Sequence, residues 1–171
     1  MDECDLHTHP HLAAVWQRRG EPMTVPAAGK DERRAVFGAL DYATGQVVWQ
    51  LSPQKGGEAF ATFLERIAQT WPDEDLVLDN VSYHRSPAVR TWWAAQEERM
   101  IPFWLPAYAP TLNLIERVWR FLKQKLACHR CWADVTGLEA IAATLLDRIE
   151  ARFHTDQPPA IRLVQNFCEA A

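Results

Sequence analysis

The chain has 171 residues, of which 48% are hydrophobic, and its 18 Lys and Arg against 22 Asp and Glu give a net charge of −4. This length fits one domain with its own core, or one domain and a short tail. The acidic balance counts against a basic protein that coats nucleic acid, but not against an enzyme whose acidic site binds cations.

The amino-terminal residues lack a signal-peptide pattern, and no apolar run is long enough to span a membrane. The cysteines are too sparse for the disulfide framework of a small secreted domain. They are Cys4, Cys128, Cys131 and Cys168. These features predict a cytoplasmic protein.

The first half of the chain predicts strands followed by a helix. Alternating or continuous apolar residues, bounded by turn residues, predict four strands. They are residues 1–7, as the end of a strand, Glu21–Pro26, Arg33–Tyr42 and Gly45–Ser52. A hairpin turn at residues 43–45 connects the last two. Glu58–Trp71 then has apolar residues at helical spacing.

The second half alternates strands and helices. Glu74–Asn80 is short and apolar, as expected of a buried parallel strand. Ser86 and Pro87 predict the start of a helix that ends near Glu98, because Ser is a good N-cap and Pro suits the first helical position. The remaining predicted elements are a strand at Met100–Leu105 and helices at Thr111–Ala127, Gly137–Phe153 and Pro158–Phe167.

This order predicts an α/β fold, with a mixed central sheet of three antiparallel and then two parallel strands, flanked by helices. Pro158-Pro159 is the only candidate linker. We therefore predict one domain over residues 1–155 and a tail over residues 156–171.

Asp79 is the first candidate for chemistry. The run Leu76–Leu78 buries its strand, so the acid emerges at the carboxyl edge, where open α/β sheets bind ligands. Asn80 and His84 add polar groups to the same loop. A strand-end Asp that caps a turn is the ordinary alternative, and His84 is either a neighbour of the site, a phosphate contact or a plain loop histidine.

Glu116 is the second candidate and lies early in the helix predicted at Thr111–Ala127. A third acid, Asp2, stands at the start of the chain. Three carboxylates on separate elements suit hard divalent cations, which prefer oxygen ligands. The helix of Glu116 is also rich in basic residues, which either contact DNA or form an ordinary solvated face. They are Arg117, Arg120, Lys123 and Lys125.

Two motifs carry a family resemblance: L-D-N-x-x-x-H at residues 78–84 and L-P-A-Y-A-P-T-L-N-L-I-E-R-V-W-R-F-L-K at residues 105–123. They resemble the catalytic domain of IS630/Tc1–mariner transposases, as does W-x-x-R-G at residues 16–20. The resemblance covers about residues 1–130. Leu114 departs from it, since the family usually has Pro there.

The resemblance implies a ribonuclease H-like DDE domain in which Asp2, Asp79 and Glu116 bind two Mg²⁺ or Mn²⁺ ions. It implies phosphoryl transfer, with metal-dependent strand cleavage and strand transfer of an insertion sequence. The further residues that we expect to contact DNA or support the acids are Asn80, His84, Asn113, Arg117, Arg120 and Lys123.

The implied partners are the DNA of the element ends and of the target, bound by a homodimer in the nucleoid of a prokaryote. Family members carry helix-turn-helix modules and a full first strand before the first acid, whereas here Met1 directly precedes Asp2. We therefore expect an upstream segment or a separate reading frame to supply sequence recognition, and this chain alone to bind DNA weakly.

Three alternatives stay open at this point. The chain could be an inactive remnant, or the partner half of a split element, that only binds DNA or dimerises. Asp5, His7 and His9 form a D-x-H-x-H motif like that of barrel-type metal-dependent hydrolases, although the chain is short for such a barrel. Cys128 and Cys131 form half of a zinc site, or simply two thiols.

Overall fold

Two groups of strands form the centre of the molecule in the computed structural model, which describes residues 1–12, 16–21, 24–26, 29–96, 99–106, 112–128 and 130–153. Strands β1 (Asp2–His7), β2 (Arg33–Leu40) and β3 (Val47–Ser52) form an antiparallel sheet in that order. Strands β4 (Leu76–Leu78) and β5 (Pro102–Trp104) pair in parallel.

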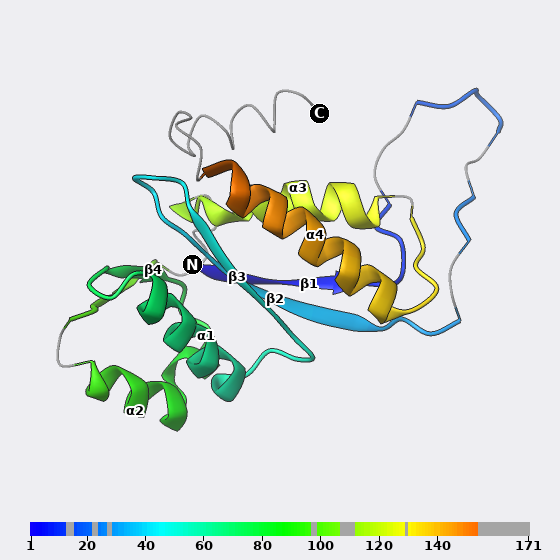
Figure 1. Cartoon of the computed structure of the whole chain (residues 1–171). Helices are drawn as coiled ribbons and strands as arrows, with labels where there is room; N and C mark the ends of the chain where they lie inside the picture. Colours follow the sequence, from blue (N-terminus) through cyan, green and yellow to red (C-terminus); the bar gives the residue numbers. More distant parts are fainter. Residues whose placement is uncertain are drawn as a thin grey trace.

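The two sheets meet at the start of β1. The backbone nitrogen of Met1 donates to the carbonyl oxygen of Val77, over 2.6 Å, so β1 begins beside β4 (Figure 1). The mixed arrangement of three antiparallel and two parallel strands is the one predicted from the element order.

Helices cover both faces of the strands (Figure 1). On one side lie α1 (Gly57–Thr70) and α2 (Pro87–Ala95), joined to β4 through the short 3-10 turn η1 (Ser82–Arg85). On the other lie α3 (Ile115–Ala127) and α4 (Val135–Phe153).

The middle strand β2 explains why two helical layers form. Alternate strand residues point to opposite faces. Phe37 packs into a core with Phe60 and Phe63 of α1, whereas Val36 packs into a second core with Trp119 of α3. A strand buried on both faces is apolar, as β2 is from Ala35 to Leu40, after the two arginines that begin it.

Local signals placed most elements correctly. Ser86 caps α2, since its side chain accepts a hydrogen bond from the backbone nitrogen of Val89, and Pro87 is the first helical residue. The predicted hairpin between β2 and β3 turns where Gly45 adopts a φ of 81°, a conformation that glycine accepts without strain.

The strand predicted over Glu21–Pro26 is wrong for the residues that the structure describes there. Glu21 and Thr24–Pro26 lie in no strand, and residues 22–23 are outside the described ranges. Pro26 explains part of the failure, because proline cannot donate a hydrogen bond to a strand ladder.

Some helix boundaries differ from the predicted ones, and some predicted elements lie outside the described residues. Helix α3 begins at Ile115, later than predicted, and α2 ends at Ala95. The terminal helix Pro158–Phe167, the Pro158-Pro159 linker and the tail after residue 155 are outside the described ranges. Among the helices described, none has the combined length and apolarity that a membrane crossing requires.

Candidate active site

Two long-range contacts of Met1 help to bring the predicted acids to one end of the fold. The Met1–Val77 hydrogen bond places the start of β1 beside β4, and Asp79 directly follows that strand. The side-chain amide of Asn113 donates to the carbonyl oxygen of Met1, over 2.9 Å. That contact holds the segment just before α3 against the start of β1. Glu116 is the second residue of α3.

Asp2 is the buried member of the three acids. It is the first residue of β1, and the strand continues beyond it to His7, whereas the resemblance led us to expect this Asp at a strand end. The indole nitrogen of Trp119 in α3 donates to its Oδ2 over 3.1 Å. Asp2 is therefore attached to the helix that carries Glu116.

The electrostatics of Asp2 show that the other acids are close. Burial is the main cause that raises its pKa to about 7, and repulsion from Glu3, Glu116 and Asp79 raises it further. A carboxyl beside like charges resists ionisation. The structure thus brings Asp79 and Glu116 each into electrostatic range of Asp2.

Asp79 and Glu116 are more accessible than Asp2. The Asp79 side chain is 39% exposed, and its Oδ1 accepts hydrogen bonds from the backbone nitrogen of Val81 (3.3 Å) and from His84. Glu116 is exposed in the first turn of α3. There the partial positive charge of the helix N-terminus favours a carboxylate.

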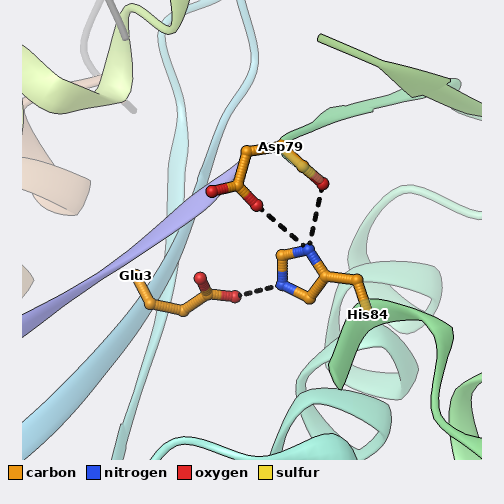
Figure 2. A group of neighbouring side chains, drawn as sticks. All are labelled: Glu3, Asp79 and His84. Atoms are coloured by element: carbon orange, nitrogen blue, oxygen red, sulfur yellow. Dashed lines mark hydrogen bonds and ion pairs between the residues drawn. The ribbon is translucent and has the colours of Figure 1, made fainter. Parts of the chain in front are cut away.

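His84 lies between two carboxylates (Figure 2). Its Nδ1 is 3.1 Å from Asp79 Oδ1 and 3.3 Å from the Asp79 carbonyl oxygen. Its Nε2 is 2.8 Å from Glu3 Oε1. The side chains of His84 and Glu3 are almost fully buried, at 0% and 2% exposed. Of the roles considered for His84, this burial favours that of a neighbour that supports the site.

These contacts shift the pKa values of the residues involved. Burial lowers the pKa of His84, but hydrogen bonds to Asp79 and Glu3 outweigh burial and raise it to about 9. The bond from His84 is the main cause that lowers the pKa of Asp79. Burial, and then the charge of Glu3 and a hydrogen bond with it, raise the pKa of Tyr83.

Glu3 was not among the residues predicted for the site. Strand alternation is the signal that separates it from Asp2, because adjacent residues of β1 face opposite sides of the sheet. Asp2 faces Trp119, and Glu3 faces His84. The partner of Glu3 lies 81 residues away, so the sequence does not reveal it.

The two predicted asparagines support the backbone around the acids. Asn80 donates to the carbonyl oxygen of Leu105 (2.6 Å) and accepts from Arg85 (2.6 Å), which connects the ends of β4 and β5. Asn113 is buried, and its Oδ1 has no hydrogen-bond partner among the described residues.

The predicted basic residues all lie on α3. Arg120 and Lys125 are exposed, and Arg117 and Lys123 are partly exposed. Lys123 lines a pocket of about 430 Å³ that also includes Glu3 and Lys55. This pocket runs along β1 from Glu3 to His7.

The histidine motif and the cysteine pair do not form metal sites among the described residues. His7 pairs with Asp31 (2.7 Å), and Asp5 pairs with Lys55 (3.1 Å). The one cluster of three or more potential ligands found there is Glu3, Asp79 and His84. The barrel-type hydrolase interpretation is therefore not favoured, and Cys128 and Cys131 belong to no group of three or more potential ligands in the part of the chain that the structure describes.

The donor set around Asp2, Asp79 and Glu116 fits a divalent cation. All three side chains offer carboxylate oxygens, the ligands that Mg²⁺ and Mn²⁺ prefer. Burial is the main cause of the raised pKa of Asp2, and the negative charges of Glu3, Glu116 and Asp79 add to it. A bound cation would neutralise that charge, which lowers the pKa of a neighbouring acid.

Comparison with known proteins identifies relatives over most of the chain. A family model described as a DDE superfamily endonuclease matches residues 1–139. The "insertion element IS630 uncharacterized 39 kDa protein" of Shigella sonnei is 30% identical over 134 residues, which are 76% of this chain and 39% of that protein.

Solved structures share the fold. The Mos1 transposase paired-end complex with the left transposon end matches with a TM-score of 0.66 and 14% identity, covering 98% of this chain and 51% of that one. The Mos1 mariner paired-end complex with Mn matches with a TM-score of 0.65 and 15% identity, at the same coverage. The catalytic core domain of BIV integrase matches with a TM-score of 0.52 and 13% identity, covering 86% of this chain and 94% of that one.

These likenesses confirm the expected ribonuclease H-like fold. The chain spans about two fifths of the length of the Shigella protein and about half of the Mos1 chains. The family model covers far more than half of the chain, and the relatives agree with it. The chain therefore belongs to the DDE superfamily of endonucleases.

Proposed function

We propose that this chain is the catalytic domain of an insertion-sequence transposase, which cleaves DNA strands and joins them to target DNA. The observation that carries the proposal is the convergence of Asp2, Asp79 and Glu116, from separate elements, at one end of a DDE fold. The pKa of Asp2 is consistent with it: burial is the main cause that raises this pKa, and the charges of Glu3, Glu116 and Asp79 raise it further.

In this proposal the three carboxylates hold two Mg²⁺ or Mn²⁺ ions. Such ions supply Lewis-acid stabilisation of the charge that develops on the phosphate during an in-line displacement. Trp119 keeps Asp2 in place through its indole hydrogen bond, and the first turn of α3 keeps Glu116 at the same end of the fold.

The bonds change in two steps. A water oxygen attacks phosphorus, the bond from phosphorus to the 3′ oxygen breaks, and that oxygen takes up a proton. The 3′-hydroxyl then attacks a phosphate of the target DNA and displaces its 3′ oxygen. The reaction needs no covalent bond to the protein, so the acids act by position and charge.

DNA is the proposed substrate and partner. Basic residues of α3 lie on the helix that carries Glu116, where a phosphate backbone has to approach. Recognition of the element ends by a helix-turn-helix segment, and dimerisation on DNA, belong to the same proposal. The relatives are longer than this chain, which leaves room for such functions in their other parts.

A strand-cleavage assay on plasmid DNA with Mn²⁺ tests the proposal. We expect Asp79→Asn and Glu116→Gln each to reduce cleavage to background, because each removes a metal-binding charge without changing the shape of the side chain. Asp73→Asn is the matched control, since this exposed acid precedes β4, whereas Asp79 follows it.

The control should cleave like the unchanged chain, and thermal melting should show that all variants are folded. Full cleavage by either site variant, or by the unchanged chain in excess EDTA, would contradict the mechanism. An absence of cleavage by the unchanged chain, together with no Mn²⁺ binding, would favour the alternative of an inactive remnant.

A further inference from the structure

The contacts of His84 connect two carboxylates. Nδ1 faces two oxygens of Asp79, and Nε2 faces the carboxylate of Glu3. Both ring nitrogens therefore face acceptors, so the His84 ring bridges Asp79 and Glu3.

The ring is also fixed in orientation. It stacks on Phe60 of α1, with ring centroids 4.0 Å apart and planes at 28°, and Tyr83 meets it edge-on at 4.8 Å. Both nitrogens are hydrogen-bonded, so rotation of the ring would break two charge-assisted bonds in a buried place. Glu3 completes the arrangement from the opposite side of the ring (Figure 2).

The arrangement leaves one oxygen of Asp79 available. The hydrogen bonds from His84 and Val81 both engage Oδ1. Among the residues that the structure describes, none is hydrogen-bonded to Oδ2. Oδ1 is therefore held by hydrogen bonds, whereas Oδ2 is open. A carboxylate fixed in this way can present Oδ2 to a cation in a defined direction.

We propose that Glu3 and His84 are positioning residues for Asp79: Glu3 orients the His84 ring, and the ring orients the Asp79 carboxylate toward a divalent cation. The inference rests on the proposed function, because it assigns a role within the same site. Groups that orient metal ligands typically contribute about 10–100-fold to metal affinity. His84 and Glu3 themselves do not coordinate the cation.

Mn²⁺ binding, followed by electron paramagnetic resonance, tests the inference on the 171-residue chain. The main variant is the double change Glu3→Leu with His84→Phe. It replaces a buried ion pair by apolar groups, an exchange that proteins often tolerate. We expect this variant to melt within a few degrees of the unchanged chain and to bind Mn²⁺ about 10–100-fold more weakly.

His7→Phe is the matched control. His7 also lies on β1 and pairs with a carboxylate, Asp31, but it is exposed and away from the acids. Its Mn²⁺ affinity should equal that of the unchanged chain. If the double variant does not fold, Glu3→Gln replaces it: Gln keeps the acceptor oxygen but loses the charge, so we expect a loss of about tenfold.

Two results would overturn the inference. One is native Mn²⁺ affinity in the double variant or, where that variant does not fold, in Glu3→Gln. The other is the ¹⁴N coupling of a directly coordinated imidazole in the spectrum of the bound Mn²⁺, lost on His84→Phe, which would make His84 a ligand. Asp79→Asn separates this failure from that of the proposed function, because unchanged Mn²⁺ binding by that variant would reject the site itself.

Discussion

A single position on β2 makes the burial of Asp2 possible. Gly38 lies opposite Asp2 in the β1–β2 pairing. A Cβ at Gly38 would lie 2.4 Å from the Trp119 ring and 2.9 Å from Ile115. Because glycine has no side chain, the indole can pass over β2 and reach the Asp2 carboxylate.

Gly38→Ala should therefore disturb both the core and the site. We expect the free energy of unfolding to fall by about 1–3 kcal/mol, the usual cost of overpacking, and Mn²⁺ affinity to fall because Trp119 can no longer hold Asp2. Urea denaturation and Mn²⁺ titration measure the two effects. The control is Gly29→Ala, where a Cβ would meet nothing within 4 Å. Equal stability of the two variants would refute the role given to Gly38.

At the scale of one element, α3 carries both Glu116, an acid of the proposed site, and several basic residues. Helical residues are about 100° apart around the axis. Arg120 and Lys123, four and seven residues after Glu116, therefore share its face. Lys125, nine residues after it, lies about half a turn away, and its ammonium group sits 5.8 Å from the Phe121 ring. The four predicted basic residues therefore do not share one face of α3: Arg120 and Lys123 lie on the face of Glu116, and Lys125 does not.

This geometry predicts how α3 meets DNA. Changing Arg120 and Lys123 together to Ala should weaken DNA binding and reduce the slope of log K against log salt by about 0.9 per lost phosphate contact. Lys125→Ala should leave the slope unchanged. Binding isotherms at several salt concentrations measure both. Equal slopes for the three proteins would show that the stripe of Glu116, Arg120 and Lys123 is only a solvated face.

At the scale of the whole molecule, the acid cluster connects stability to pH and to cations. The pKa of Asp2 is about 7 in the folded chain, above its ordinary value of 3.8. The folded chain therefore holds this proton more tightly than the unfolded chain does. By linkage, the contribution of Asp2 to stability is greatest below about pH 4 and is lost as pH rises to about 7.

Asp2→Asn should consequently stabilise the metal-free chain at pH 8, by at most about 4 kcal/mol, and have little effect at pH 4. The amide keeps an acceptor for Trp119 but carries no charge. Millimolar Mg²⁺ should raise the melting temperature of the unchanged chain more at pH 8 than at pH 6, since the proton competes with the cation. Thermal melts between pH 4 and pH 8, with and without Mg²⁺, measure both effects. An increase in melting temperature with Mg²⁺ that does not depend on pH would contradict the placement of Asp2 in the site.

Much of the molecule could be read from local patterns. Patterns that span a few residues predicted three elements near the site. They are an apolar run for the strand before Asp79, the Ser86-Pro87 start for the next helix, and amphipathic spacing for the helix of Glu116. The order of these elements predicted the fold class. The family could be predicted because its motifs occupy two contiguous stretches, residues 78–84 and 105–123. The local pattern failed between residues 21 and 26, where short apolar spacing carried no information about pairing partners.

The sequence by itself therefore determined the elements, the family and two acids at element ends. Only the tertiary structure decided that Glu3 meets His84, 81 residues away, and that Trp119 reaches Asp2, 117 residues away. Contacts of that range depend on how sheets and helices pack, which no local period encodes. Neighbouring acids on one strand, Asp2 and Glu3, received different surroundings because a strand sends successive side chains to opposite faces.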